Sequence, residues 1–225
     1  MTSSAHFELE THNGACILRL VSPDGTNRLT RACVLALTQQ LRELARQQAG
    51  APSARRGCER WGGRPLIITG NQKFFSAGAE LEEIIALTGP EAYEFSLMGQ
   101  ALMNEVARFP ARVIAAITGY CMGGGLDLAL ACHRRLASPH AVFGHRGAAL
   151  GLITGWGGTQ RLPRLVGKAR ALQMMIEAEK VHAREALRIG LVDAIADDPI
   201  SAAITMLTKV GSWQPVVRSP ARISP

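Results

Sequence analysis

Two glycine-containing segments carry residues that could bind an anion through backbone N–H groups. Residues 74–81 read Phe-Phe-Ser-Ala-Gly-Ala-Glu-Leu, and residues 119–127 read Gly-Tyr-Cys-Met-Gly-Gly-Gly-Leu-Asp. Each segment follows an expected buried strand and leads into an expected helix. N–H groups at helix starts favour negative charge and can stabilise the oxyanion of a reaction intermediate. The alternative is that these glycines only permit tight turns and close packing.

The elements that must position these segments can be read from the spacing of apolar residues. Apolar positions three and four apart indicate helices, and short apolar or alternating runs indicate strands. Strand, helix and strand in succession are typical of a right-handed crossover, so we expect a mainly parallel sheet with helices around it. The expected strands span 66–69, 113–117 and 191–195, with a hairpin over 7–21 that turns at Asn13-Gly14. The expected helices span 30–50, 80–87, 90–109, 159–165, 168–177 and 183–189.

Composition excludes several classes of protein. The chain has 225 residues, of which 47% are hydrophobic and 19% charged, which is typical of a globular protein and excludes disorder as the dominant state. The longest uncharged apolar stretch, 113–126, is too short to cross a bilayer and contains three consecutive glycines. The first ten residues show neither a basic leader nor a hydrophobic run, so we expect a cytoplasmic protein without a membrane partner.

Cysteine, histidine and charge patterns limit the cofactors and partners. The five cysteines have no zinc-ribbon or redox-pair spacing, so we expect free and mostly buried thiols. The six histidines include no pair at the i, i+4 spacing of a helical metal site, and we expect no metal. The net charge of +7 favours an anionic partner, which could be nucleic acid, a membrane surface or a phosphorylated small molecule.

Two further segments make the pattern more specific. Residues 143–151 read Phe-Gly-His-Arg-Gly-Ala-Ala-Leu-Gly, and residues 157–162 read Gly-Gly-Thr-Gln-Arg-Leu. With the two glycine turns, in this order, the sequence resembles the crotonase superfamily, also called the enoyl-CoA hydratase/isomerase family, over about 7–197. The resemblance implies an α/β fold, a spiral of repeated ββα units with surrounding helices. It also implies an enzyme that binds an acyl-CoA thioester as its substrate, with no other cofactor, and stabilises its enolate.

The resemblance also implies roles for individual residues. The family's two oxyanion donors correspond to the backbone N–H groups of Ala79 and Gly124. The turn that lies against the adenine of CoA corresponds to residues 23–27, where Gly25 and Thr26 are the expected contacts. The other substrate-binding residues expected from the matching motifs are Ala77, Gly78, Leu81, Tyr120, Gly123 and Gly147.

The acid and base positions depart from the family pattern. Hydratases of the family use one carboxylate after the glycine triplet, where this chain has Asp127, and a second carboxylate where it has Gly147. One carboxylate suffices to move a proton between carbons, so we expect isomerase-type or other enolate chemistry over efficient hydration. Asp127 could instead be a first-turn residue that the helix dipole favours. His145 is a candidate acid or base by residue type, with a packed side chain as the alternative.

The resemblance gives one acyl-CoA-binding domain over 1–197, with an arginine-rich loop insertion at about 49–64. Residues 198–225 are expected to form a shortened C-terminal helical segment and a mobile tail. Relatives use longer C-terminal helices to cover the acyl pocket and to build trimers or dimers of trimers. We therefore expect a homotrimer or hexamer, although the short C-terminus leaves both the oligomer and the pocket cover open.

Three functions remain distinct possibilities at this point. The first is an enzyme of the hydratase/isomerase type, a lyase or an isomerase. The second is a protein that binds acyl-CoA with little or no catalysis, because a second carboxylate is missing. The third is RNA binding through the arginine-rich loop, which the sequence disfavours because Trp61 is the only aromatic residue there. The cations of that loop are Arg55, Arg56, Arg60 and Arg64.

Overall fold

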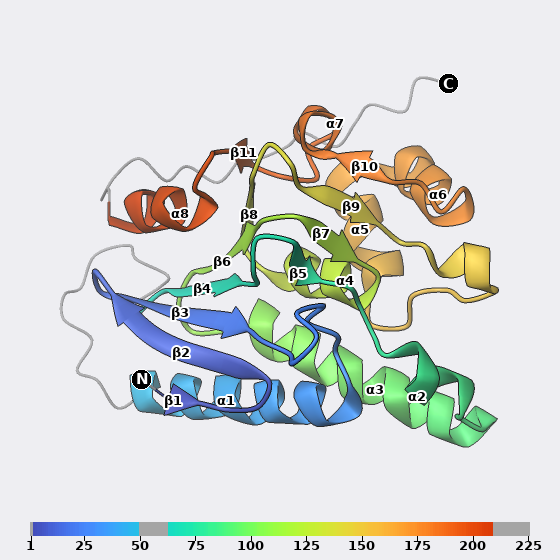
Figure 1. Ribbon diagram of the computed structural model, residues 1–225, viewed down its shortest axis with the longest axis horizontal. Coiled ribbons are helices and arrows are strands. Elements are labelled where there is room, and N and C mark those ends of the chain that lie inside the picture. Colours follow the sequence, from blue (N-terminus) through green and yellow to red (C-terminus); the bar gives the residue numbers. More distant parts are fainter. Residues whose placement is uncertain (1, 50–62, 209–225) are drawn as a thin grey trace.

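The computed structural model describes residues 2–49 and 63–208, in which two sheets are surrounded by helices (Figure 1). The strands are β1 (Thr2–Ser3), β2 (Phe7–His12), β3 (Ala15–Leu20), β4 (Leu66–Thr69), β5 (Phe74–Ser76), β6 (Val113–Ile117), β7 (Tyr120–Met122), β8 (Arg134–Ala137), β9 (Val142–Gly144), β10 (Val181–His182) and β11 (Ala194–Ile195). The helices are α1 (Arg31–Ala49), α2 (Leu81–Ile85), α3 (Gly89–Ala107), α4 (Gly124–Ala131), the 3₁₀ helix η1 (Gly147–Leu150), α5 (Gly158–Val166), α6 (Lys168–Ile176), α7 (Ala183–Arg188) and α8 (Pro199–Thr208).

The consecutive strand pairs β4–β5, β6–β7 and β8–β9 each contribute one strand to each of the two sheets. The larger sheet has the order β1-β2-β3-β4-β6-β8-β11, and the smaller has the order β10-β9-β7-β5. The first strand of each pair (β4, β6, β8) runs parallel in the large sheet, and the second (β5, β7, β9) runs parallel in the small one. Helices follow each pair, which is the repeated ββα arrangement that the resemblance implies. The turns after β5, β7 and β9 therefore leave the small sheet at the same edge.

The expected N-terminal hairpin is confirmed. Strands β2 and β3 pair antiparallel from Phe7↔Leu20 to His12↔Ala15. Between them Asn13 and Gly14 have φ angles of 48° and 81°, as a type I′ turn requires. Beyond it, β3, β4, β6, β8 and β11 pair parallel in the large sheet, so the expected mainly parallel sheet is confirmed as well.

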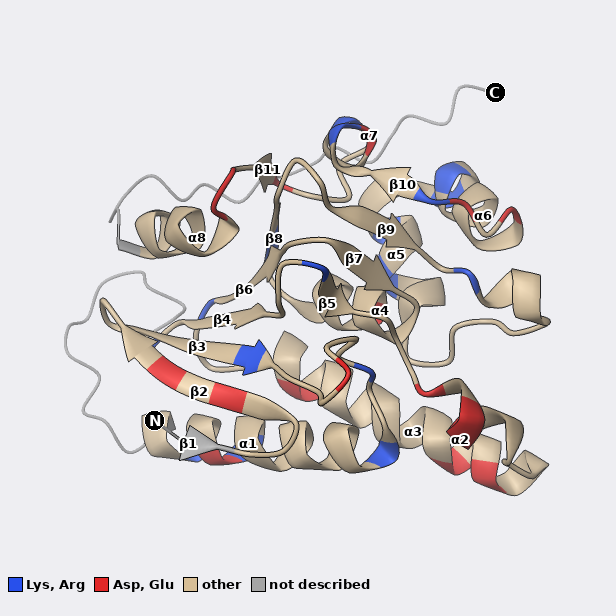
Figure 2. Cartoon of the chain, in the orientation of Figure 1, with Lys and Arg blue, Asp and Glu red and all other residues tan. Residues whose placement is uncertain are grey.

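Both faces of the large sheet are covered by apolar packing. Leu66, Ile68 and Val113 pack into the main core, which α1 and α3 also line. The alternate residues Ile67 and Ile114 face the other way and pack with α8. Strands β4 and β6 are apolar at every position except Thr69, as is typical of strands buried on both faces. Figure 2 shows both strands without charged residues.

Two expected elements are shorter in the structure. The helix expected over 80–87 ends at Ile85, because the chain turns there and the N–H of Leu87 bonds to the carbonyl of Ile84. The strand expected over 191–195 contains only Ala194–Ile195. The N–H groups of Leu191 and Val192 both donate to the carbonyl of Ala186 at the end of α7, so those two residues are buried in a turn.

Some expectations fall partly outside the described residues. The arginine-rich loop, apart from Ala49, Gly63 and Arg64, and the tail 209–225 lie outside them, as does Cys58. Cys16, Cys33, Cys121 and Cys132 are free and buried, as expected. Within residues 2–49 and 63–208, no helix is both long and apolar enough to span a membrane.

A buried ion-pair cluster ties the C-terminal part of the chain to β8. The carboxylate of Asp193 accepts a hydrogen bond from Arg134 Nη1 at 2.6 Å and lies 3.2 Å from Arg135 Nη2. It also accepts from the backbone N–H of Arg135 at 2.9 Å. The side chain of Asp193 is 10% exposed and that of Arg135 is 6% exposed, so solvent screens this cluster weakly.

Replacing Asp193 with asparagine should destabilise the fold strongly. Removing one partner of a buried pair leaves the other charge uncompensated, at a cost of about 3 kcal/mol or more. Glu43→Gln, which removes the exposed pair with Arg46, should cost less than about 1 kcal/mol. Urea unfolding of both variants measures the difference, and equal small losses would contradict the role given to Asp193.

Candidate functional site

The turn after β5 is held by the segment that precedes α1. Ser76 Oγ donates to the carbonyl of Asn27 at 2.7 Å and accepts from the N–H of Gly78 at 3.1 Å. The N–H of Leu29 donates to the carbonyl of Gly78 at 2.8 Å. The N–H and C=O of Gly78 are thus both fixed, so the orientation of the following peptide, whose N–H belongs to Ala79, is fixed as well.

The turn after β7 brings a second amide to the same place. Gly123 has a φ of 48° and its N–H donates to the carbonyl of Gly144 at 2.9 Å, after which α4 begins at Gly124. A Cβ built on Gly124 would lie 3.3 Å from the nitrogen of Ala79. Within the described part of the chain, the N–H groups of Ala79 and Gly124 donate no hydrogen bond to another residue. Two neighbouring amides are therefore free to bind a ligand.

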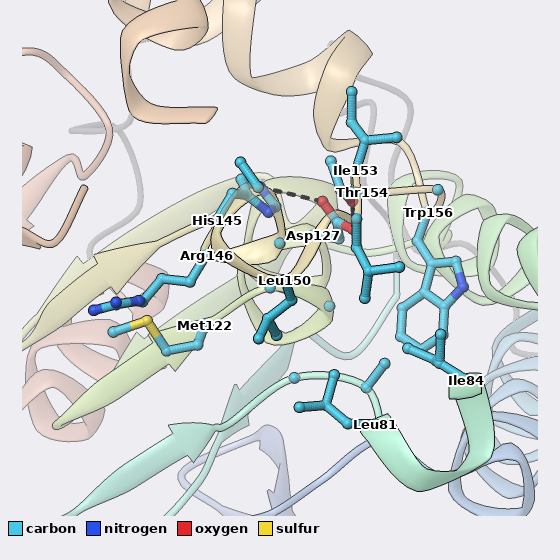
Figure 3. Close-up of a pocket in the computed structure, with 18 of the residues that line it drawn as sticks. Leu81, Ile84, Met122, Asp127, His145, Arg146, Leu150, Ile153, Thr154 and Trp156 are labelled. Carbon is cyan, nitrogen blue, oxygen red and sulfur yellow. Dashed lines mark hydrogen bonds and ion pairs between the residues drawn. The ribbon is translucent and has the colours of Figure 1, made fainter. Parts of the chain in front are cut away.

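A pocket of about 530 Å³ opens beside these amides (Figure 3). Much of its wall is aliphatic or aromatic, with Leu81, Ile84, Leu150, Ile153 and Trp156 among the lining residues. Most of the residues expected for the site lie in this wall. They are Ala77, Gly78, Ala79, Leu81, Gly123, Gly124, Asp127, His145 and Gly147.

Asp127 is the buried carboxylate of the pocket. It lies in the first turn of α4 and is 1% exposed, and its Oδ2 accepts a short hydrogen bond from Thr154 Oγ1. Burial raises the pKa of Asp127 to about 7, and the Thr154 hydroxyl, Arg161 and the Gly158 amide limit the rise because they stabilise the charged form. A carboxyl group with such a pKa can accept or donate a proton near neutral pH.

His145 faces Asp127 from the end of β9. Its Nε2 lies 3.4 Å from Asp127 Oδ1, and the ring is 4% exposed. Burial lowers the pKa of His145 to about 4, because desolvation disfavours the imidazolium. A Cβ on Gly158 would lie 2.3 Å from Asp127 Oδ1 and 2.8 Å from His145 Nε2, so only glycine fits beside this pair.

Gly147, the position where the resemblance places a second carboxylate in hydratases, lines the pocket. A Cβ at Gly147 would lie 2.7 Å from the carbonyl oxygen of Leu152, a backbone atom. The N–H of Leu152 also donates to the Gly147 carbonyl at 2.8 Å. The loop therefore closes on the space that any side chain at this position would use.

Three of the expected substrate-binding residues do not line this pocket. Gly25 and Thr26 lie in the turn before α1, where the Thr26 carbonyl accepts the N–H of Ala77 at 2.9 Å. Tyr120 stands at the start of β7, with its ring centroid 5.5 Å from that of Phe74. Contacts of Gly25, Thr26 and Tyr120 with a CoA moiety outside the pocket stay predictions.

The structure adds residues to the site that the sequence alone does not indicate. Thr154 fixes Asp127, and Trp156 packs its ring against Gly124 while its Nε1 donates to the carbonyl of Phe95 at 3.2 Å. The segment 157–162 contributed only to the family pattern, although Gly158 borders the Asp127–His145 pair. No sequence signal pointed to Thr154, whose contact spans 27 positions along the chain. Among the described residues, no group of three His, Cys, Asp or Glu could hold a metal ion.

Comparisons with known proteins indicate the family of the chain. The family model described as enoyl-CoA hydratase/isomerase matches residues 10–210. A probable enoyl-CoA hydratase of Bacillus subtilis is 47% identical over 140 residues, which cover 61% of this chain and 54% of that protein. The chain thus matches little more than half of that relative's length.

Solved structures show the same fold. The structure of DspI from Pseudomonas aeruginosa is 33% identical, with a TM-score of 0.82, and the match covers 96% of this chain and 84% of DspI. An enoyl-CoA hydratase from Bacillus anthracis is 30% identical, with a TM-score of 0.79, over 89% of this chain and 74% of that structure. From the family match over most of its length, and from this structural likeness, the chain belongs to the enoyl-CoA hydratase/isomerase family, the crotonase superfamily.

Proposed function

We propose that this protein is an enzyme that stabilises the enolate of an acyl-CoA thioester with the N–H groups of Ala79 and Gly124. The observation that carries the proposal is the pair of adjacent amides, both without an internal acceptor, at the wall of an apolar pocket. When a base removes a proton next to the thioester carbonyl, negative charge develops on its oxygen. Two fixed donors lower that barrier because they need no reorganisation during the reaction.

Asp127 is the base in this proposal. Its carboxylate lines the same pocket, and its raised pKa of about 7 lets it take a proton from one carbon and return it to another. That transfer is the isomerisation of a double bond, or another reaction through the same enolate. Efficient hydration would need a second group to activate water, and Gly147 supplies no side chain. We therefore favour isomerase-type chemistry over hydration.

The pocket supports an apolar acyl group. Its wall between α2, η1 and α6 is built from aliphatic residues, of which Leu81, Leu150 and Leu172 are three. An acyl chain gains affinity there with each buried methylene, whereas a charged acyl group would lose its hydration. Coenzyme A enters as part of the substrate, and no other cofactor is needed. A trimeric or hexameric assembly and a cytoplasmic location stay predictions.

A second candidate is a protein that binds acyl-CoA without turnover. The missing carboxylate at Gly147 favours it, and so does the burial of Asp127. Calorimetry separates the two candidates, since binding of acyl-CoA with no reaction of any thioester supports the second. RNA binding through the arginine-rich loop is a weaker candidate, because Trp61 is the only aromatic residue of that loop on which a base could stack.

Turnover of a thioester panel tests the proposal directly. We expect the protein to convert 3-enoyl-CoA to 2-enoyl-CoA, with kcat/KM rising through about pH 7 because the base must be ionised. Asp127→Asn should lower kcat by about 10²–10⁴ and keep acyl-CoA binding. Asp197→Asn, on the exposed surface, is the control. Inactivity of the wild type on enoyl, 3-enoyl and malonyl thioesters would refute the proposal that the protein is an enzyme of this kind.

Asp127→Asn should stabilise the protein against unfolding at neutral and higher pH. The folded state holds a proton on Asp127 that the unfolded state releases, so the wild type loses stability from about pH 4 to pH 7 through this group. The stability of Asp127→Asn relative to wild type should rise over that interval, by roughly 4 kcal/mol at most, and then level off. His145 contributes to the pH dependence of stability in the opposite direction, because burial lowers its pKa in the folded state. This contribution is present in the wild type and in Asp127→Asn. Denaturant titration at several pH values measures the difference, and a constant difference would contradict the burial argument.

The oxyanion donors are tested through the glycine that lets them meet. Gly78 has a φ of 103°, and a Cβ there would lie 2.8 Å from the carbonyl oxygen of Met122. Gly78→Ala should displace the Ala79 amide and lower kcat by about 10²–10³. Gly14→Ala has a comparable backbone cost, with a φ of 81° and no atom within 4 Å, and should leave kcat unchanged. Equal activities of the two variants, measured on the same thioester, would remove Ala79 from the mechanism.

A further inference from the structure

Asp127 and His145 form a buried polar pair in the wall of a largely apolar pocket. Asp127 Oδ1 and His145 Nε2 lie 3.4 Å apart, as the dashed line in Figure 3 marks. Both atoms are fully buried, and within the described part of the chain neither makes a hydrogen bond of standard geometry, with the other or with a third atom. Leaving a buried acceptor and a buried ring nitrogen unsatisfied is costly. Each atom is thus the natural partner of the other.

Asp127 Oδ1 faces both His145 Nε2 and the start of α5, where the Gly158 amide stabilises the charged form of the carboxylate. Thr154 Oγ1 donates to the other oxygen, Oδ2, which fixes the rotation of the carboxyl group. Gly158 at the start of α5 lies against Oδ1 and Nε2 and leaves no room for a side chain between them. Three separate segments, α4, the end of β9 and the segment before α5, therefore hold the two atoms face to face.

We infer that Asp127 and His145 share one exchangeable proton, and that His145 relays this proton between Asp127 and water in the pocket. When Asp127 is protonated, its Oδ1–H donates to Nε2, and the imidazole carries its proton on Nδ1. When Asp127 is ionised, Nε2–H donates to Oδ1, and Nδ1 is bare. Release of a proton therefore consists of transfer from Oδ1 to Nε2 and loss from Nδ1. The ring is neutral before and after.

The surrounding charges support a neutral imidazole with a titrating carboxyl group. Arg161 on α5 favours the ionised carboxylate, and Cys121 on β7 is a buried thiol whose pKa is raised well above its usual value, so it stays neutral. Arg146 follows His145 in the chain, but Figure 3 shows its side chain directed away from Asp127, beside Met122. Burial lowers the pKa of His145 to about 4, which disfavours a second proton on the pair.

The relay rests on the proposed function only for the substrate step, so the resting protein provides an independent test. With ¹⁵N-labelled histidine, the Nε2 resonance of His145 should change from the unprotonated to the protonated type as Asp127 ionises near pH 7. The ring should stay neutral throughout. Asp127→Asn should abolish this titration. A His145 that becomes an imidazolium, or keeps one tautomer from pH 5 to 9, would overturn the inference whatever the enzyme does.

Isotope transfer tests the relay during catalysis. With 3-enoyl-CoA in D₂O, the wild type should place deuterium in the 2-enoyl product, because the proton on Asp127 exchanges through His145. His145→Gln keeps a hydrogen-bonding side chain but cannot relay, so most of this deuterium should be lost and the substrate's own proton retained. His140→Gln, an exposed histidine outside the pocket, should behave as wild type.

The outcomes separate the relay from the proposed function. Unchanged deuterium content in an active His145→Gln overturns the relay and leaves the enolate mechanism standing. If the wild type forms no product but His145 changes tautomer in the resting protein, the proposed enzymatic function is refuted. The inference that Asp127 and His145 share a proton is then supported. If His145→Gln does not fold, His145→Asn takes its place, with thermal melting as the check on both variants.

Discussion

The close approach of two backbone turns, possible only where side chains are absent, is the constraint on which the site depends. A Cβ on Gly78 would lie 2.8 Å from the Met122 carbonyl, and one on Gly125 would lie 2.7 Å from the Cβ of Ser76. The parallel strands β5 and β7 of the small sheet bring these turns to one edge, but the missing side chains let the amides meet. The ligand oxygen that they would bind needs both, since one donor neutralises only part of the developing charge.

Burial at Asp127 links stability to chemistry. A carboxyl group in solvent is ionised at neutral pH and is a weak base, whereas the same group 1% exposed inside an apolar wall titrates near pH 7. The hydroxyl of Thr154 and the start of α5 limit the shift, so the group is neither permanently neutral nor permanently charged. Burying the Asp127 carboxyl group lowers the stability of the fold at neutral pH. In return, the pocket holds a carboxyl group that gains and loses a proton near pH 7.

The order of the elements and the two turns could be predicted from sequence because their signals are local. Asn13-Gly14 specifies its hairpin turn, and the apolar runs 66–69 and 113–117 specify buried strands. The contact of Thr154 with Asp127 could not be predicted, since it depends on how the segment before α5 folds over the pocket. His145 was a candidate by type alone, and its place opposite Asp127 follows from the three-dimensional arrangement.

Gly147 shows how the local backbone can exclude a side chain from one position in a pocket. The carbonyl of Leu152 lies 2.7 Å from the place where a first side-chain atom would stand, and the Leu152 amide is bonded back to Gly147 at 2.8 Å. A mutation that introduces glutamate here must therefore arrive together with a reshaped 148–152 segment, because the side chain and the present backbone would compete for the same space and the two changes are not independent. The effect of a side chain at position 147 thus depends on the conformation of the 148–152 segment. A laboratory selection for water addition would have to diversify the whole loop rather than one codon.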